Sequence, residues 1–592
     1  MILGDILKTG MKLAKFSNEV IAKKLREIVA AYEVKGEDRF KIRAYDNAAT
    51  SVEHATEEVR DLWESGKIKE LAGIGPAIAD HLDELFRTGR VKHFDEVKKG
   101  LPEGMFEILG TPGIGAKNAY SLAKTLHLRK GSAKADLLRA ARSGKIRGRP
   151  GFGEVSEKAI LENLEKTKKD ENRMSLPMAG EIARKIIDYL KKNPKVIHVD
   201  ALGSLRRGTA TVGDVDIAVA TSNPKDVVAY FTRYPEAVET LNEGDVKGRI
   251  VLSSGRQIDL MTQKPEAYGS LLQHFTGSKN HNIHLRELAI SKGLSLSEYG
   301  IRNKAGRVER FSTEEDFYKR LGLDYIPPEL REDRGEVDLA AKHSLPDLIE
   351  VGDIKGDLQS HTVWSDGRAT LEEMAARAKG KGYEYLGITD HQLSLETKGI
   401  TAIRSEIKRR NELIEQINSS YKNFRVLNGI EILIKADGDL SYPDELLQEF
   451  DYVLAAIHTG FNQDKVRITQ RITAALRNPF VKILAHPTTR LIGRRDVIDA
   501  DWEEVFRVCR DEDKILEIDA LPDRLDLPDI LIQEAKKYGI KFAIDSDAHA
   551  VEHLDLISYG VTVARRGRLS KSDVINTLSF GKLKEVLKIK GR

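Results

Sequence analysis

Residues 203–219 read GSLRRGTATVGDVDIAV, and this stretch decides the fold of the first half of the chain. The run DVDIAVAT has the apolar, β-branched composition of a buried strand, yet Asp214 and Asp216 stand two positions apart at its start. Side chains at i and i+2 of a strand point to the same face, so the two carboxylates repel each other unless a cation lies beside them. The stretch therefore predicts a divalent-cation site at a strand end, with an anion bound next to the basic turn.

A third carboxylate is expected on a neighbouring strand. The runs GRIVLSS and RQIDLMT, split near Ser254-Gly255, are typical of a hairpin whose second strand carries Asp259. Three carboxylates from two strands can hold two Mg²⁺ or Mn²⁺ ions ~3.5–4 Å apart, the arrangement used for phosphoryl transfer. Ser204, Arg207 and backbone amides of GSLRRG are suited to a triphosphate. A solvated strand end without chemistry is the alternative.

The chain as a whole is globular in composition and long enough for several domains. It has 592 residues and a net charge of +3, so overall charge does not mark it as a nucleic-acid-binding protein. The single cysteine, Cys509, excludes an internal disulfide framework and a cysteine-based zinc finger. No run approaches the ~18 apolar residues of a membrane span, and the N-terminal residues lack a signal-peptide pattern. We expect a soluble, cytoplasmic monomer with no membrane partner.

Three turns of the type Gly-x-Gly occur in the N-terminal part, where apolar residues recur at helical spacing. Glycine lets such a turn adopt positive φ, and it lets backbone N–H groups at the start of the next helix approach a phosphate. The pattern resembles the helix-hairpin-helix motif, which binds the DNA backbone without reading sequence. The turns lie in LAGIGPAIA (71–79), TPGIGAKNA (111–119) and GRPGFGEVSEKA (148–159), and the expected DNA-contacting glycines are Gly73, Gly75, Gly113 and Gly115.

Ordinary helix caps are the alternative for any one of these turns. Their repetition favours DNA binding, and so does the local charge. Residues 111–150 hold ten Lys and Arg side chains against one acid, Asp136. Such a run can be a merely solvated face, but beside two phosphate-binding turns it is suited to a DNA backbone.

GSLRRG, GDVDIAV and QIDLM together are similar to the nucleotidyltransferase signature of family X DNA polymerases, the group of DNA polymerase beta. FKIRAYDNAA (40–49) resembles the N-terminal domain of that family, and HFTGSKNHNIHLRELAISKGLSLSEYGI (274–301) resembles its nucleotide-selecting thumb. The resemblance covers residues 17–333. It implies a polymerase that fills short gaps during DNA repair, using dNTPs on gapped or primed DNA.

The resemblance also implies roles for single residues. Asp214 and Asp216 would bind both metals, and Asp259 would help to activate the primer 3′-hydroxyl. The residues expected to contact the dNTP or DNA are Ser204, Arg207, Gly213, Phe275, Gly277, Ser278, Asn282, Arg286 and, at a 5′-phosphate, Lys41.

Two positions depart from the family pattern. His274 stands where the family often has the tyrosine of the sugar gate, which leaves the choice between deoxyribose and ribose open. His81 replaces the lysine with which many relatives form a Schiff base, and Ala77 replaces a nearby lysine. Because removal of deoxyribose phosphate needs a nucleophilic amine, we expect this domain to lack that lyase activity.

Strand-like and helical runs alternate from about residue 350 to 580, which predicts repeated β/α units closing into a barrel. Nearly every strand-like run ends in His, Asp or Glu, at the position where α/β barrels carry their chemistry. Imidazoles and carboxylates are the ligands that Zn²⁺ and Mn²⁺ prefer. The candidates are His361, Asp366, His391, Glu431, His458, His486, Asp547 and His549.

This set resembles the PHP (polymerase and histidinol phosphatase) domain, which implies a distorted (β/α)7 barrel holding up to three metals. The implied chemistry is attack of a metal-bound hydroxide on a phosphoester: 3′→5′ exonuclease action, with 3′-phosphatase or abasic-site cleavage as further activities. The implied ligand sets are His361, Glu431 and Asp547; Glu431, His458 and His486; and Asp366, His391 and His549.

Gln359 stands where the PHP family has the first histidine of a His-x-His motif. An amide is a poorer ligand than a neutral imidazole, although its oxygen can bind Mn²⁺. A structural, catalytically degenerate PHP module therefore competes with an active hydrolase as the interpretation of the barrel. For the polymerase half, the competing interpretations are a template-independent nucleotidyltransferase and a DNA-binding tether that only delivers the hydrolase.

We therefore expect a multi-domain chain with α+β and α/β parts. The expected domains are a helical DNA-binding domain (1–95), fingers with helix-hairpin-helix motifs (96–175), a nucleotidyltransferase palm (176–263), a thumb (264–333), a linker (334–350) and a PHP barrel (351–592).

Overall fold

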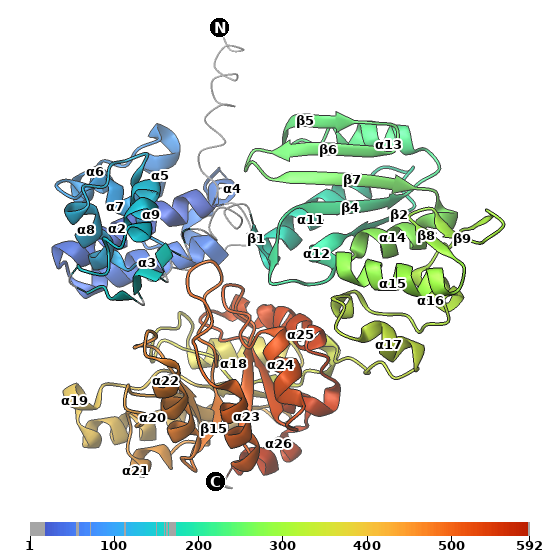
Figure 1. Ribbon diagram of the computed structural model, residues 1–592. Helices are drawn as coiled ribbons and strands as arrows, with labels where there is room; N and C mark the ends of the chain where they lie inside the picture. The colour runs from blue at the N-terminus through green and yellow to red at the C-terminus, as the bar shows by residue number, and fades with distance from the viewer. Residues whose placement is uncertain are drawn as a thin grey trace. The chain divides into compact units, whose positions relative to one another are not determined.

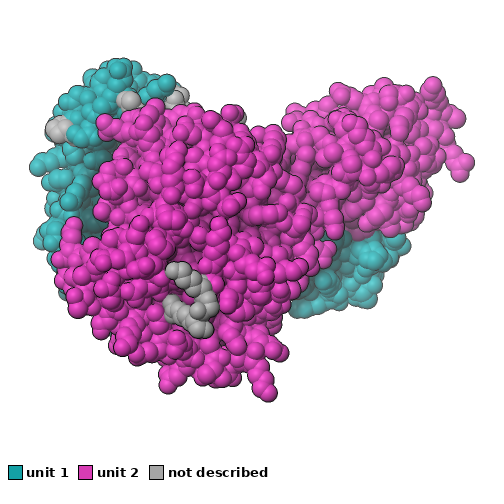
Figure 2. Space-filling model, turned by 90° about the horizontal axis from the view of Figure 1, so that it is seen from below, with its two compact units in different colours: residues 1–205, 211–265, 493–495 teal, residues 206–210, 266–492, 496–592 magenta. Residues whose placement is uncertain are grey.

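The computed structural model describes residues 18–54, 59–64, 66–71, 73–111, 114–149 and 173–589, with residues 151–154, 156–158, 160–161 and 164 between them. No helix in this described part is long and apolar enough to cross a membrane. The chain forms two compact units, coloured separately in Figure 2. One comprises residues 1–205, 211–265 and 493–495, and the other residues 206–210, 266–492 and 496–592.

The N-terminal part of the first unit is helical. In its first helix Ile21, Leu25 and Ile28 recur at helical spacing and are fully buried in one core cluster. Gly75 and Gly115 directly precede the helices that begin at Pro76 and Ala116, so two of the predicted turns do open helices. The helices are α2 (Asn18–Lys35), α3 (Arg39–His54), α4 (Val59–Glu64), α5 (Pro76–Thr88), α6 (Lys92–Lys98), α7 (Glu103–Ile108), α8 (Ala116–Thr125) and α9 (Ala133–Arg142).

A five-stranded sheet follows in the first unit, in the order β2-β4-β7-β6-β5. Strands β6 and β7 are antiparallel neighbours, which confirms the predicted hairpin. Strand β7 alternates between buried and half-buried positions, and α13 packs against it, which buries one face of the sheet. The elements are α11 (Leu176–Leu190), β2 (His198–Ala201), β4 (Val215–Ala220), α13 (Pro224–Phe231), β5 (Ala237–Glu243), β6 (Lys247–Leu252) and β7 (Gln257–Gln263).

The second unit begins with the thumb. Here the side chain of Arg331 is fully buried and pairs with the buried Glu314 at 2.6 Å; Arg206 pairs with the same carboxylate at 2.6 Å. The elements are α14 (Tyr268–Thr276), α15 (Lys279–Ser291), β8 (Ser295–Ser297), β9 (Gly300–Arg302), β10 (Val308–Glu309), α16 (Glu314–Arg320) and α17 (Glu336–Ala341).

The segment expected to be a linker, residues 334–350, is a packed part of this unit. It contains α17, whose Val337 and Ala340 belong to the thumb core. Glu336 is buried and lies 2.7 Å from the buried imidazole of His281. Ile349, at its end, already belongs to the core of the barrel.

Seven parallel strands follow in sequence order, with helices on their outer side (Figure 1). A bridge between Ser360 and Ala548 links the first strand to the last, so the barrel is nearly closed. This confirms the expected fold class. The strands are β11 (Gly356–Asp357), β12 (Tyr385–Ile388), β13 (Arg425–Leu433), β14 (Tyr452–Ala456), β15 (Val481–Leu484), β16 (Ile515–Asp519) and β17 (Lys541–Asp545); the helices are α18 (Leu371–Gly380), α19 (Leu395–Lys398), α20 (Ile400–Ser420), α21 (Asp444–Leu447), α22 (Lys465–Leu476), α23 (Trp502–Asp511), α24 (Asp529–Lys536), α25 (Ile557–Arg566) and α26 (Phe580–Leu587).

The buried Arg206–Glu314–Arg331 triad predicts a large effect of Glu314→Gln. Burial disfavours the Glu314 carboxylate, but the two guanidinium groups outweigh it and hold its pKa below the usual value. Removing that charge leaves Arg331 buried without its counter-ion, so we expect the free energy of unfolding to fall by about 3–5 kcal/mol. Urea denaturation measures this. The exposed neighbour Glu315→Gln is the control, and an equal effect of both changes would contradict the prediction.

Candidate active sites

The three predicted carboxylates of the palm lie at one edge of its sheet. Strands β4 and β7 are parallel neighbours, and Asp216 stands directly opposite Asp259 in their register. Asp214 precedes β4 by one residue and is exposed. Gly203 has φ +60°, and a Cβ there would lie 2.8 Å from Oδ2 of Asp216, so only glycine lets the basic turn pack against this carboxylate. The carboxylates therefore converge as the spacing predicted.

Their mutual charge is visible in the electrostatics of Asp216. Burial, and then the negative charges of Asp259 and Asp214, raise the pKa of Asp216 to about 6. Arg249 acts in the opposite direction. A divalent cation at this edge would relieve the repulsion that raises the pKa, so the three side chains fit the metal pair that the sequence predicts.

Arg249 is a member of this site that the sequence analysis did not identify. It stands opposite Asp259 in the β6–β7 pairing and donates two hydrogen bonds to that carboxylate, at 2.5 and 2.9 Å. The signal is present in the hairpin itself, because the register that places Arg249 opposite Asp259 follows from the turn near Ser254. The guanidinium fixes the orientation of the Asp259 carboxylate.

Arg207, one of the predicted triphosphate residues, contacts residues of the thumb. Arg207 donates to the carbonyl of Thr276 at 2.6 Å and pairs with Glu332 at 3.0 Å, with 13% of its side chain exposed. Arg566 of α25 donates to the backbone carbonyl of Arg207 at 2.8 Å and pairs with Glu332 at 3.0 Å. Arg206 pairs with Glu314 and has 19% of its side chain exposed, so each of the two adjacent arginines is held by a carboxylate of the thumb.

The remaining thumb residues surround the start of α15. Ser278 caps this helix, its hydroxyl accepting from the backbone N–H of His281 at 3.3 Å, and it follows Gly277, whose φ is +69°. Asn282 donates to the carbonyl of His274 at 2.7 Å. The further predicted contacts here are Phe275, whose ring lies 4.9 Å from that of His274, and Arg286, which is exposed on α15.

In the helical region the predicted DNA contacts are spread over several elements. Lys41 is exposed on α3 and pairs with Glu37 at 3.2 Å. His81, in place of the lysine, shares a hydrogen bond of 2.8 Å with the hydroxyl of Tyr45 and stacks on His93 at 4.6 Å. Gly73 has φ +85°, whereas Gly113 and the residue before it lie outside the described residues.

The predicted metal ligands of the barrel lie together at the carboxyl ends of its strands. Parallel strands end on the same side, so their last side chains converge on one cleft. His361 and Asp366 follow β11, His391 follows β12, Glu431 lies within β13, His458 follows β14, His486 follows β15, and Asp547 and His549 follow β17.

Glu431 is the centre of this group and is almost completely buried. Its Oε1 lies 2.8 Å from Nε2 of His458 and 3.0 Å from Nε2 of His486. Its Oε2 lies 3.3 Å from Nε2 of His361 and 3.4 Å from Nδ1 of His391. One carboxylate thus faces imidazoles from four strand ends.

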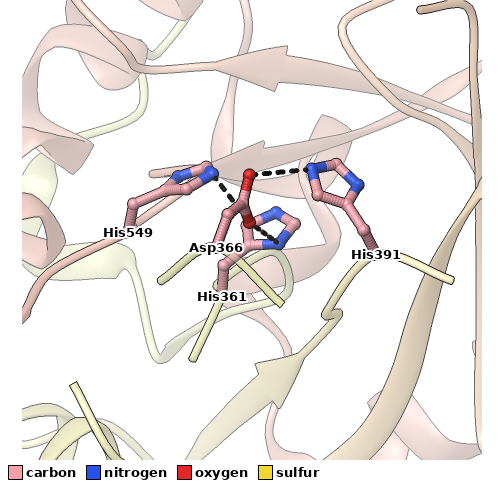
Figure 3. A group of neighbouring side chains, drawn as sticks. All are labelled: His361, Asp366, His391 and His549. Carbon is pink, nitrogen blue, oxygen red and sulfur yellow. Dashed lines mark ion pairs between the residues drawn. The ribbon is translucent and has the colours of Figure 1, made fainter. Parts of the chain in front are cut away.

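Asp366 forms a second centre, nearer the surface. Figure 3 shows its carboxylate between three imidazoles. The distances are 3.5 Å to Nε2 of His391, 3.6 Å to Nε2 of His549 and 3.8 Å to Nδ1 of His361. These are longer than hydrogen bonds, as expected where ligands converge on a shared ion rather than on each other.

The ligand atoms fall into three groups, within each of which they lie no more than 4.8 Å apart. Compared with the sets that the resemblance implied, His361 also joins the Asp366 group, and His391 stands beside Glu431 and His458 in the place expected for His486. His486 still contacts Glu431. The groups are His361, Asp366, His391 and His549; His391, Glu431 and His458; and His361, Glu431 and Asp547.

Gln359 points into the same cleft. Its amide nitrogen donates to Glu431 at 3.2 Å and to Asp547 at 3.3 Å, while its buried Oε1 finds no hydrogen-bond partner among the described residues. Buried nitrogens of His361 and His458 also lack a hydrogen bond of good geometry within that part of the chain. Buried polar atoms are normally satisfied, so this donor set fits bound metal ions.

Burial and charge shift the proton equilibria of the cleft in opposite directions. Burial disfavours a charge on His361, but the nearby carboxylates of Asp547 and Glu431 outweigh this and raise its pKa well above the usual value. Burial would likewise raise the pKa of Glu431, yet His391 and His458 hold it well below the usual value. A metal ion must therefore displace a proton from His361.

A second layer of buried carboxylates lies beneath the ligands, and the sequence analysis did not identify it. Glu517 and Asp519 are fully buried in β16, and Asp545 is fully buried at the end of β17. Burial and the neighbouring negative charges raise their pKa values. Asp545 accepts from the backbone N–H of Leu358 at 2.7 Å, which ties the first strand to the last.

The raised pKa of Asp216 predicts that Asp216→Asn stabilises the metal-free protein. The native state binds this proton more tightly than the unfolded chain, so ionisation costs stability as pH rises from about 4 through about 6. At pH 7.5 and without metal, we expect a gain of about 1–3 kcal/mol that disappears towards pH 4. Urea denaturation at both pH values measures it. Asp245→Asn changes an exposed carboxylate and should leave the free energy of unfolding unchanged at both pH values. A loss of stability in Asp216→Asn would contradict the prediction.

The cleft predicts a further effect, on removal of metal from the barrel. Because bound ions offset the charges around Glu431, a chelator should lower the thermal midpoint of the barrel by about 5–10 °C at neutral pH. The effect should shrink at pH 5.5, because protons compete with the metal ion for His361 more strongly as the pH falls. Calorimetry with and without chelator measures this. In Glu431→Gln the chelator should no longer lower the thermal midpoint. A wild-type midpoint that is the same with and without chelator would contradict metal binding in the cleft.

Comparison with protein families matches three parts of the chain. A helix-hairpin-helix domain matches residues 16–91, a DNA polymerase beta thumb matches residues 271–332, and a PHP domain matches residues 357–520. The matches agree with the helical region, the thumb and the barrel described above.

Among curated proteins, a DNA polymerase/3′-5′ exonuclease PolX of Bacillus subtilis is 37% identical over 95% of this chain and 98% of its own length. DNA polymerase lambda of Rattus norvegicus is 25% identical over 53% of this chain and 56% of its own. A probable phosphatase of a Thermoanaerobacter species is 28% identical over 40% of this chain and 95% of its own. The chain belongs to the PolX family of family X DNA polymerases that carry a PHP domain.

Proposed function

We propose that this chain is a DNA polymerase that fills short gaps during DNA repair, using dNTPs on gapped or primed DNA and two-metal nucleotidyl transfer. The observation that carries the proposal is the register that sets Asp216 opposite Asp259, with Asp214 at the start of the same strand and Arg249 holding Asp259. The full-length similarity to a polymerase/exonuclease supports it.

In this mechanism the three aspartates would hold Mg²⁺ or Mn²⁺, with Asp214 and Asp216 as the expected ligands of both ions. The ions would lower the pKa of the primer 3′-hydroxyl and stabilise the charge on the transferring phosphorus. Asp259, oriented by Arg249, would help to activate the primer 3′-hydroxyl. Ser204, Gly213 and Arg207 bind the triphosphate, and Asn282 and Arg286 contact the nascent base pair and the template.

We propose further that the barrel is a 3′→5′ exonuclease that uses Zn²⁺, Mn²⁺ or both. His361, Asp366, His391, Glu431, His458, His486, Asp547 and His549 would hold the ions, which supply a hydroxide nucleophile at neutral pH. The supporting observation is Glu431, one buried carboxylate facing four imidazoles. The Oε1 of Gln359, which has no hydrogen-bond partner in the described part of the chain, offers an oxygen ligand in place of the family histidine, which suits Mn²⁺.

A second candidate activity is removal of a 3′-phosphate, favoured by the similarity of the barrel to probable phosphatases. A structural PHP module is the opposite possibility, since Gln359 replaces one ligand. Primers ending in 3′-hydroxyl and in 3′-phosphate separate these activities in a single assay.

The two active sites can be tested separately with a 5′-labelled primer in a one-nucleotide gap, Mn²⁺ and no dNTP. Asp216→Ala protein should be unable to polymerise, so we expect any shortening to come from the barrel. Adding His391→Ala should reduce trimming at least about 100-fold, because it removes a ligand shared by two groups. His343→Ala, an exposed histidine paired with Asp324, is the matched control. An intact primer with folded, DNA-bound Asp216→Ala protein would favour the structural module.

A further inference from the structure

A cavity of about 920 Å³ opens beside the barrel cleft. One wall is the loop after β11, through Val363 and Trp364; the other is the exposed face of α20. This volume is in the range of small-molecule sites. The α20 side chains that line it are Arg409, Glu412, Leu413, Glu415, Gln416 and Ser419.

The cavity is next to the metal ligands because of Trp364. This residue stands two positions before Asp366, so their Cα atoms are at most ~7 Å apart. Trp364 also lines a smaller neighbouring pocket together with His391. Trp364 therefore lines both the cavity and the pocket that His391 lines, and it lies two residues from Asp366.

The loop that carries Trp364 is held in place by a buried carboxylate. Asp390 accepts from the backbone N–H and the hydroxyl of Thr362, at 2.7 and 2.8 Å, and from the hydroxyl of Ser365 at 2.8 Å. A Cβ on Gly367 would lie 2.3 Å from the carbonyl of His361, so the chain turns tightly here. The indole is thus positioned before any ligand arrives.

The composition of the walls is that of a base-binding site. The guanidinium of Arg409 lies 4.5 Å from the centre of the indole ring, and the side chain of Val363 is 56% exposed. Indole and guanidinium planes are the surfaces on which unpaired bases stack. Glu412, Glu415 and Gln416 offer acceptors for the exocyclic amino groups of adenine, cytosine and guanine.

We infer that this cavity binds the nucleobase of the 3′-terminal nucleotide while its phosphodiester lies at the barrel ligands. The inference rests on the exonuclease function proposed above. A site of this kind holds an unpaired end, and its acidic wall favours amino-bearing bases over thymine.

The test uses two primers in the Asp216→Ala background, one ending in deoxyadenosine and one whose terminal sugar lacks a base. Trp364→Ala should slow single-turnover trimming of the first roughly 10-fold or more and leave the second nearly unchanged, because only the first has a base to stack. Equal loss on both primers would mean that Trp364 merely positions Asp366. No loss on either would mean that the cavity binds no base.

Arg409→Ala should repeat the base-dependent loss. Its matched control is Arg510→Ala, an exposed arginine in the last turn of α23, at the end of the barrel opposite the ligands. An equal effect of both changes would indicate general charge rather than a base site.

Binding is measured separately from cleavage by tryptophan fluorescence. The chain has three tryptophans, so replacing Trp63 and Trp502 by Phe leaves Trp364 as the only reporter. Addition of dAMP should quench it, and deoxyribose 5-phosphate should not. Quenching without any trimming by Asp216→Ala protein would retain the base site and reject the exonuclease; absence of quenching would reject the base site.

Discussion

Repulsion between carboxylates that the backbone forces onto one sheet edge is the constraint on which both halves of this protein depend. In the palm, the parallel register of β4 and β7 sets Asp216 against Asp259. In the barrel, strands that all end on one side bring Glu431 and Asp547 together. Such clusters are costly in a protein interior without an opposite charge, and imidazole, guanidinium or a metal ion must supply it. The fold thus brings carboxylates close together, and a bound metal ion would offset their repulsion.

The two sites place different positively charged side chains beside their carboxylates. Arg249 holds Asp259 in the palm with a permanent positive charge, so that carboxylate stays oriented whatever the metal content. The barrel instead surrounds Glu431 with imidazoles, which can carry a proton or give it up to a metal. Asp259 therefore has a fixed positive partner, whereas the positive charge around Glu431 depends on protons or on a metal ion.

Much of both sites could be predicted because short-range periodicity determines it. The two-residue spacing of Asp214 and Asp216 and the turn near Ser254 fix which side chains share a face. The position of His391 directly after its strand follows from the alternation of strands and helices, and Glu431 lies within the next strand, β13. Arg249 could have been found from the register of the predicted hairpin. Glu517 and Asp519 could not be predicted, because their roles depend on which strands lie beside β16.

Other features could not be predicted because distant residues decide them. Arg206 and Arg207 are adjacent and chemically identical, yet each is held by a different carboxylate more than 100 positions away in the chain, Arg206 by Glu314 and Arg207 by Glu332. The same holds for residues 334–350. Their polar composition indicates a linker, but burial of Glu336 against His281 depends on a fold that local sequence does not encode.

The arginines at the end of α25 and just after it connect the barrel to the thumb. Arg565 pairs with Glu329, Arg566 with Glu332, and Arg568 donates to the carbonyl of Arg334. Without the barrel, the carboxylates of Glu329 and Glu332 would lose these counter-ions. Without the thumb, Arg566 would keep only its pair with Asp529 of the barrel. The charges of each half are therefore balanced in part by the other, so that neither surface is suited to a separate module.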